Sequence, residues 1–188
     1  MQFPYSVSCT SPTTASVSHS VVDAGLVGCR AGDEELLGMN VTVPVTTVCP
    51  CSKAISDYGA HNQRGMVSIG VSFSHAHREW PMSFAALIGV AEHAASAPVY
   101  PLVKRPDERT LTMAAHDRPA FVEDVVRDCA LALQSLPVVE RFSVEVVNLE
   151  SIHAHNAFAR VEWPPAPPLS MAAAPAECVV VGRSATWG

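Results

Sequence analysis

The sequence has little charge and no excess of basic residues. Charged side chains make up 16% of its 188 residues, and 12 lysines and arginines stand against 18 aspartates and glutamates. This low charged fraction, beside 48% hydrophobic residues, argues against a disordered chain and allows one domain with a sizeable core. The net charge of -6 gives no sign of nucleic-acid binding, because phosphate-binding surfaces are normally basic.

Two kinds of targeting segment are also missing. No apolar run reaches the length of about 18 residues that a membrane helix needs. The opening residues MQFPYSVSCTSP lack the basic and apolar regions of a secretory signal. We therefore expect a cytoplasmic protein without a membrane partner, in which the six cysteines are metal ligands, nucleophiles or buried side chains rather than disulfides.

The pattern of apolar residues predicts an α+β fold. Alternation typical of strands occurs in residues 41–46, 65–74, 141–149 and 155–163. Residues 81–97 and the segment from Pro119 to Pro137 have the spacing and the prolines of helices. Pro44 cannot donate to a strand ladder, so the first strand is expected to be an edge strand or to be interrupted there. The element order predicts an antiparallel sheet with both helices on one face.

Residues 49–64, CPCSKAISDYGAHNQR, are the most unusual stretch. Cys49 and Cys51 are followed by His61, twelve positions after the first thiol. A thiolate and an imidazole are good ligands for a divalent metal, and the residues between them are long enough to loop back between strand ends. The spacing matches no standard zinc finger and a third ligand is needed, so ordinary buried thiols remain an alternative.

Three other polar clusters have both a functional and an ordinary interpretation. Residues 103–109, VKRPDER, are expected to form a turn set by Pro106, most often a solvated loop. Glu123 lies beside the apolar stripe of the second predicted helix, where a carboxylate favours the helix dipole. Glu150, His153 and His155 fall between the last two strands, where surface turn residues are common. The residues alone leave both interpretations open.

Taken together, VPVTTVCPCSKAISDYGAHNQR, KRPDE, FVEDVVRD and ESIHAHNAFA resemble, in this order, the type IB GTP cyclohydrolases. The resemblance implies a tunnelling fold, with a four-stranded antiparallel sheet and two helices on one face. It also implies a homo-oligomer, a tetramer by family resemblance, with active sites between subunits. On this basis, residues 1–37 are expected to be remnant strands of a shortened first copy of the fold. Residues 38–163 would form the catalytic module, and 164–188 a Pro/Ala-rich tail.

The implied reaction is hydrolysis of GTP to 7,8-dihydroneopterin triphosphate and formate by a metal-activated water, the first step of tetrahydrofolate biosynthesis. The resemblance assigns Cys49, His61 and Glu108 to a manganese, iron or zinc ion. Glu150 and His153 act beside it in catalysis, together with Cys49, whereas Cys51 has only a packing or supporting role. For substrate binding we expect Glu123 to accept the adjacent N–H donors of guanine. The remaining substrate-binding candidates are Lys53, Gln63, Arg64, Lys104 and Arg105.

Three alternatives stay open. A related cyclohydrolase would make a cyclic-phosphate dihydroneopterin with the same ligands. A non-catalytic module would hold a purine or pterin through Glu123, but it would have no need of Cys49 and His61. The nitrile reductase of queuosine synthesis shares the tunnelling fold, but it would not need His61 or the ESIH block.

Overall fold

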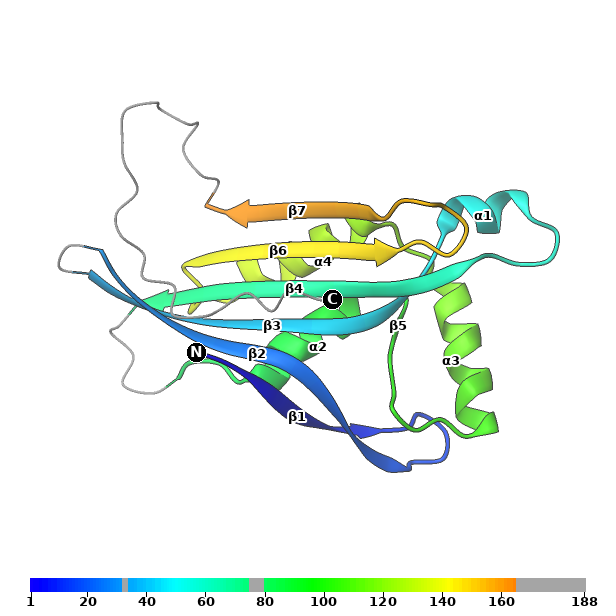
Figure 1. Ribbon diagram of the computed structural model, residues 1–188, viewed down its shortest axis with the longest axis horizontal. Helices are drawn as coiled ribbons and strands as arrows, with labels where there is room; N and C mark the ends of the chain where they lie inside the picture. Colours follow the sequence, from blue (N-terminus) through cyan, green and yellow to red (C-terminus); the bar gives the residue numbers. More distant parts are fainter. Residues whose placement is uncertain (32–33, 75–79, 165–188) are drawn as a thin grey trace.

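The computed structural model describes residues 1–31, 34–74 and 80–164, which form one antiparallel sheet with helices (Figure 1). The predicted tail, apart from Pro164, and Cys178 within it lie outside the described residues. The sheet order is β1-β2-β3-β4-β6-β7, and the short β5 pairs with β3. The strands are β1 Gln2–Thr10, β2 Val17–Ala31, β3 Glu34–Val48, β4 Asn62–Ser74, β5 Ala97–Pro98, β6 Arg141–Leu149 and β7 Ala157–Trp163.

The sheet confirms the α+β prediction and is wider than the four predicted strands. Those four correspond to β3, β4, β6 and β7, which are neighbours in the sheet. β1 and β2 continue the same sheet beyond β3, with the β2 residue Asp23 opposite Thr42. Residues 1–31 therefore extend the sheet of the rest of the chain rather than forming a separate layer.

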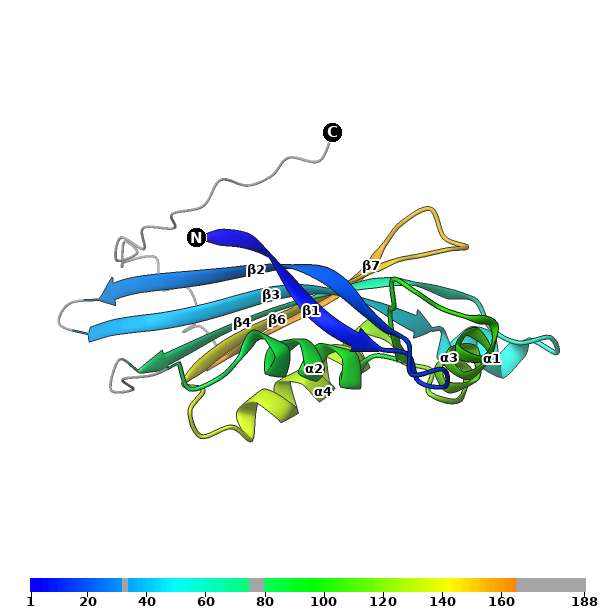
Figure 2. The ribbon, with the colours of Figure 1, turned by 90° about the horizontal axis from the view of Figure 1, so that it is seen from below.

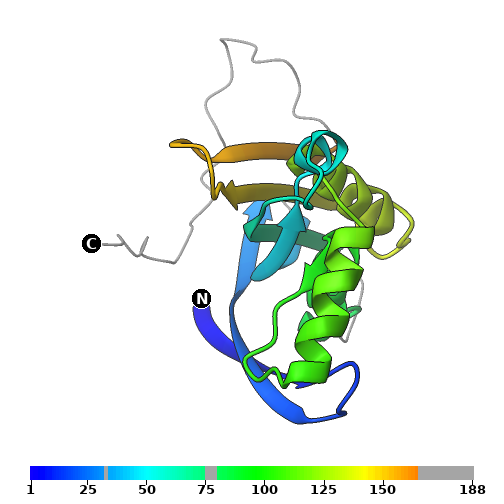
Figure 3. The same ribbon diagram turned by 90° about the vertical axis from the view of Figure 1, so that its right-hand side faces the viewer.

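In the described ranges, four helices accompany the sheet where two were predicted. The two predicted helices, α2 Phe84–Ala94 and α4 Val122–Gln134, lie side by side on one face of the sheet (Figure 2). The unpredicted helices, α1 Pro50–Ile55 and α3 Arg105–Asp117, lie at one end of it (Figure 3). None of the described helices has the length and apolar character needed to cross a membrane.

The prediction of a turn at residues 103–109 is wrong. Pro106 stands in the first turn of α3, where its missing N–H would have had no helical partner. The carboxylate of Asp107 accepts the backbone N–H of Lys104 at 3.2 Å and so caps the same turn. A charged, proline-containing stretch here begins a helix.

The core lies between the sheet and the helices α2 and α4. Strand alternation places one side chain in two on this face, and those of Val41, Ile69 and Val144 are at most 1% exposed. Leu87 from α2 and Leu133 from α4 pack against them and are fully buried. The apolar periodicity of the sequence therefore identifies the inward face correctly.

Pro44 shows how a central strand accommodates a proline. Pairing of β3 with β2 ends at Thr42, and pairing with β5 begins at Val45. Pro44 lies opposite Met66 of β4 and, in the registers of the described strands, has no partner residue on the other side. The edge-strand alternative is therefore wrong, because β3 is an interior strand that runs unbroken through Pro44, and the interruption is limited to a gap in pairing on one side.

Asp107 also fastens the turn after β1 to the start of α3. Its Oδ1 accepts the backbone N–H groups of Thr13 and Thr14 at 3.0 and 2.8 Å, and its Oδ2 accepts the Thr14 hydroxyl at 2.7 Å. Burial acts to raise the pKa of Asp107, but the hydrogen bonds from Thr14, Thr13 and Lys104 outweigh it and lower the pKa to about 2. The turn after β1 and α3 are therefore held together by an ionised carboxylate.

Candidate functional site

Cys49 and His61 meet because they flank two paired strands. Val48 at the end of β3 lies opposite Asn62 at the start of β4. One step beyond, the backbone N–H of Cys49 donates to the carbonyl of His61 at 3.1 Å. The segment between them forms α1 and returns, which confirms that it loops back between strand ends.

Ser52 holds this junction from inside the loop. Its hydroxyl donates to the carbonyl of Cys49 at 3.1 Å and accepts the backbone N–H of His61 at 3.2 Å. The Cys49 sulfur accepts the backbone N–H of Ser52 at 3.5 Å and so caps the N-terminus of α1. The thiol and the imidazole therefore stand on backbone that is fixed on both sides.

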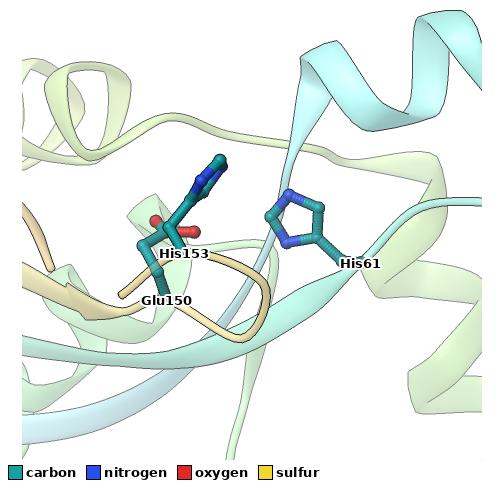
Figure 4. A group of neighbouring side chains, drawn as sticks. All are labelled: His61, Glu150 and His153. Carbon is teal, nitrogen blue, oxygen red and sulfur yellow. The ribbon is translucent and has the colours of Figure 1, made fainter. Parts of the chain in front are cut away.

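The β6–β7 connection brings Glu150 and His153 to His61. Leu149 at the end of β6 pairs with Arg64 near the start of β4, so the residues that follow β6 emerge beside His61. One donor atom from each of His61, Glu150 and His153 lies within 4.8 Å of the others (Figure 4). Imidazole nitrogens with a carboxylate oxygen form a donor set that suits zinc, iron or manganese. The described residues therefore include a group that could hold a divalent ion. Of the three predicted ligands, this group contains His61 but neither Cys49 nor Glu108, whereas Glu150 and His153 were predicted to act in catalysis.

The orientation of His61 favours metal binding. Its Nδ1 lies 3.0 Å from Oε1 of Gln63 and 3.4 Å from the hydroxyl of Ser151. Since a carbonyl oxygen only accepts, the Gln63 contact favours a proton on Nδ1. The lone pair of Nε2 is then free for a ligand, as is usual in metal-binding histidines.

A cavity of about 320 Å³ joins this cluster to the N-terminus of α4. The helix starts there because the backbone N–H of Ala120 donates to the carbonyl of Val48 at 3.0 Å, next to Cys49. Glu123 in the first turn of α4 thereby faces the same cavity as the histidines. The lining residues are Cys49, Cys51, His61, Gln63, Ala120, Phe121, Val122, Glu123, Asn148, Glu150, His153, His155 and Ala157.

The structure gathers only part of the predicted site. Cys49, Gln63, Glu123 and the three-residue cluster line the cavity, whereas the carboxylate of Glu108 does not; it is exposed on α3 and pairs with Arg105 at 2.9 Å. Of the predicted cations, none lines the cavity. Lys53 donates to the carbonyl of His116 at the end of α3, Arg64 is exposed on β4, and Lys104 and Arg105 are exposed at the start of α3.

Two further polar residues, His155 and Asn148, line the cavity without having been assigned a role. The ring of His155 stacks on that of His153, with centroids 5.4 Å apart and an interplanar angle of 25°. Asn148 is 2% exposed and follows Phe142, Val144 and Val146 on the inward face of β6. The signal for Asn148 was present in the sequence, because a polar residue continues an otherwise apolar alternation.

A protein-family model described as type I GTP cyclohydrolase folE2 matches residues 1–159. The chain belongs to this family. Curated FolE2 relatives support the assignment. The chain is 44% identical over 160 residues to the GTP cyclohydrolase FolE2 of Bordetella avium, covering 85% of this chain and 58% of the relative. It is 46% identical over 162 residues to that of Thermotoga neapolitana, covering 86% and 60%.

A third relative, the GTP cyclohydrolase FolE2 1 of Dechloromonas aromatica, is 44% identical over 162 residues, or 86% of this chain and 59% of the relative. The chain thus spans about 60% of the length of these FolE2 relatives. The matched part includes the end of β3, α4 and the β6–β7 connection, which together build the cavity.

Proposed function

We propose that this FolE2-family chain hydrolyses GTP to 7,8-dihydroneopterin triphosphate and formate, the first step of tetrahydrofolate biosynthesis. The observation that carries the proposal is the cavity that joins a potential metal cluster to the carboxylate of Glu123. Its volume of about 320 Å³ lies in the range of small-molecule sites, which is about 300–1,000 Å³. The end beside Glu123 can hold the base, and the end beside His61, Glu150 and His153 can carry out its hydrolysis.

At the catalytic end, His61 would hold the divalent ion together with Cys49, whose backbone lies beside it although its sulfur is not part of the three-residue cluster. The bound ion would lower the pKa of a coordinated water toward neutrality. Glu150 and His153 each place a side-chain nitrogen or oxygen within 4.8 Å of one on His61, so both border the same point of the cavity. There the carboxylate of Glu150 would accept a proton from water, and the imidazole of His153 would donate one to the purine nitrogen beside C8.

At the binding end, Glu123 anchors the base. Its carboxylate accepts the N1–H and 2-amino donors of guanine, and a base without those donors leaves the carboxylate unpaired. The ring of Phe121, at the start of the same helix, borders the cavity and offers an aromatic face. The triphosphate extends outward toward the cations of the predicted set, which lie outside the cavity.

The full site is proposed to form in a homo-oligomer, a tetramer by family resemblance. In such an assembly Glu108 completes the metal ligands from a neighbouring copy, since its carboxylate is exposed on α3. A GTP-consuming enzyme would act in the cytoplasm, where its substrate is made. The thiols of Cys9, Cys49, Cys51 and Cys129 are free, which fits a reducing compartment.

The test is to incubate purified protein, loaded with manganese, iron or zinc, with GTP and to follow formate and the fluorescence of the oxidised neopterin. Glu123→Gln should raise KM for GTP about 10-fold or more while the metal content is kept, because a charge-assisted pair with the base is lost. Glu140→Gln, at an exposed position before β6, is the matched control.

Three outcomes would replace the proposal. A cyclic-phosphate dihydroneopterin as product would assign the chain to the related cyclohydrolases. Bound but unaltered GTP in the metal-loaded protein would make it a binding module. Full turnover and metal content in Cys49→Ala would remove the thiolate from the site.

A further inference from the structure

Asn148 has a feature that the proposed reaction does not explain. Its side chain is 98% buried at the end of β6, and its carbonyl oxygen Oδ1 has no hydrogen-bond partner among the described residues. The same residue lines the cavity that holds Glu123. An unpartnered buried polar group costs stability, and with no partner for Oδ1 no hydrogen bond fixes which end of the amide faces the cavity.

The neighbours of Asn148 leave it room instead of satisfying it. The facing residue of β4 is Gly65, and a Cβ there would lie 2.9 Å from Oδ1 of Asn148. On the next strand, the hydroxyl of the fully buried Thr47 likewise lacks a partner among the described residues. Two unpartnered polar groups therefore flank one glycine, at the point where the apolar face of the sheet gives way to the cavity.

The chemistry of the cavity indicates what Asn148 binds, on the basis of the proposed function. If Glu123 accepts the N1–H and 2-amino groups of guanine, the adjacent atom on that edge is the 6-oxo oxygen, which needs a donor. The amide of Gln63, the other amide on the cavity wall, contacts His61 through its oxygen. Because no described residue binds Oδ1 of Asn148, the amide can take either of its two orientations, one of which directs the NH2 group toward the base.

We propose that Asn148 is a specificity-determining residue for the base: its side-chain amide donates a hydrogen bond to the 6-oxo group of guanine. An adenine presents an amino group at this position. Two donors would then face each other in a buried site, and both would lose their hydrogen bonds to water. Glu123 and Asn148 thus read neighbouring parts of one edge of the base.

Two analogues of GTP, each changed at one group of the base, separate the role of Asn148 from that of Glu123. In 6-thio-GTP the 6-oxo oxygen is replaced by sulfur, a weak acceptor, while both N–H donors remain. ITP lacks the 2-amino group and keeps the oxygen. Dissociation constants for GTP, 6-thio-GTP and ITP are measured by calorimetry on the metal-loaded protein, its Asn148→Leu variant, the Glu123→Gln variant and the Glu140→Gln control.

Asn148→Leu should weaken GTP binding about 10-fold, the value of one buried hydrogen bond. The variant should also bind 6-thio-GTP as well as GTP, while its preference for GTP over ITP is unchanged. Glu123→Gln should show the reverse pattern. The Tm of Asn148→Leu should equal or exceed that of the parent, because an apolar side chain replaces an unpartnered amide.

The outcomes distinguish this inference from the function on which it rests. Parent-like affinity of Asn148→Leu for GTP, or an unchanged preference over 6-thio-GTP, overturns the role of Asn148 alone. A fall in Tm with equal losses for all three nucleotides shows a structural role and also overturns it. Absence of GTP binding by the parent protein overturns the proposed function together with this inference.

Discussion

The inward face of the sheet has two ends, one against α2 and α4 and one beside the cavity. Both follow the same strand alternation, but the inward side chains are apolar at the first end and polar at the second. Along β3, β4 and β6 the inward residues begin as an apolar core covered by α2 and α4. Toward the cavity, the same inward rows continue as Thr47, Gln63 and Asn148, which remain buried. Alternation therefore decides which side chains point inward, whereas the packed helices decide whether the interior closes over them or leaves a site.

The largest expected effect comes from a substitution in the apolar core, at the end of the sheet that α2 and α4 cover. Leu87→Ala in α2 removes a fully buried side chain from the core and should lower the free energy of unfolding by about 2–5 kcal/mol. Leu131→Ala in α4, where the side chain is 58% exposed, is the control and should cost far less. Urea unfolding of both variants checks this, and equal losses would contradict the assignment of the core.

The next largest effect comes from a substitution at the cavity end of the sheet, which should impair metal binding without unfolding the protein. His61→Ala should weaken metal binding about 100-fold, or about 2.7 kcal/mol, because the imidazole is common to every ligand set considered. His19→Ala, at an exposed position on β2, should leave the metal affinity unchanged. Competition with a chelating dye measures both variants, and unchanged affinity in His61→Ala would remove His61 from the site.

Replacing glycine by alanine should change stability in opposite directions at the two ends of the sheet. Gly65→Ala places a Cβ 2.9 Å from Asn148 Oδ1 and 3.0 Å from a methyl of Val45, and should destabilise by about 1–3 kcal/mol. Gly89→Ala in α2 meets no atom within 4 Å and should stabilise by about 0.5–1 kcal/mol, because alanine restricts the unfolded chain more than glycine does. Thermal unfolding compares the two, and a shift in the same direction would contradict the close approach at Gly65.

The smallest effect concerns a polar group that, unlike Asn148, is fully satisfied. The folded pKa of Asp107 is about 2, below the ordinary value of 3.8. Its contribution to stability is therefore fully present above about pH 4 and is lost as the pH falls toward 2.

Asp107→Asn should accordingly have a lower Tm than the parent at pH 7, and this difference should shrink between pH 4 and pH 2. Asp117→Asn, at the exposed end of α3, should show no such change. A Tm difference for Asp107→Asn that stays constant over this range would show that the charge of Asp107 does not hold the turn after β1 to α3.

The parts of the fold predicted correctly are those with a local pattern. Alternating valines identify β3 and β4, and an apolar stripe between two prolines identifies α4, because each pattern places one face against a core. The start of α3 was missed for a local reason too. A proline among charged residues is typical of a turn, yet the first turn of a helix tolerates it equally well.

The contacts of the candidate site likewise fall into those that a local sequence pattern predicts and those that it does not. The sequence by itself determined that Cys49 and His61 meet, since they flank consecutive antiparallel strands. The tertiary structure decided that Glu150 and His153 join His61, that Glu108 stands apart on α3, and that Asn148 lies unpartnered opposite Gly65. The physical reason is that β4 and β6 are neighbours in the sheet but far apart in the chain, so their register brings together residues that no local pattern connects.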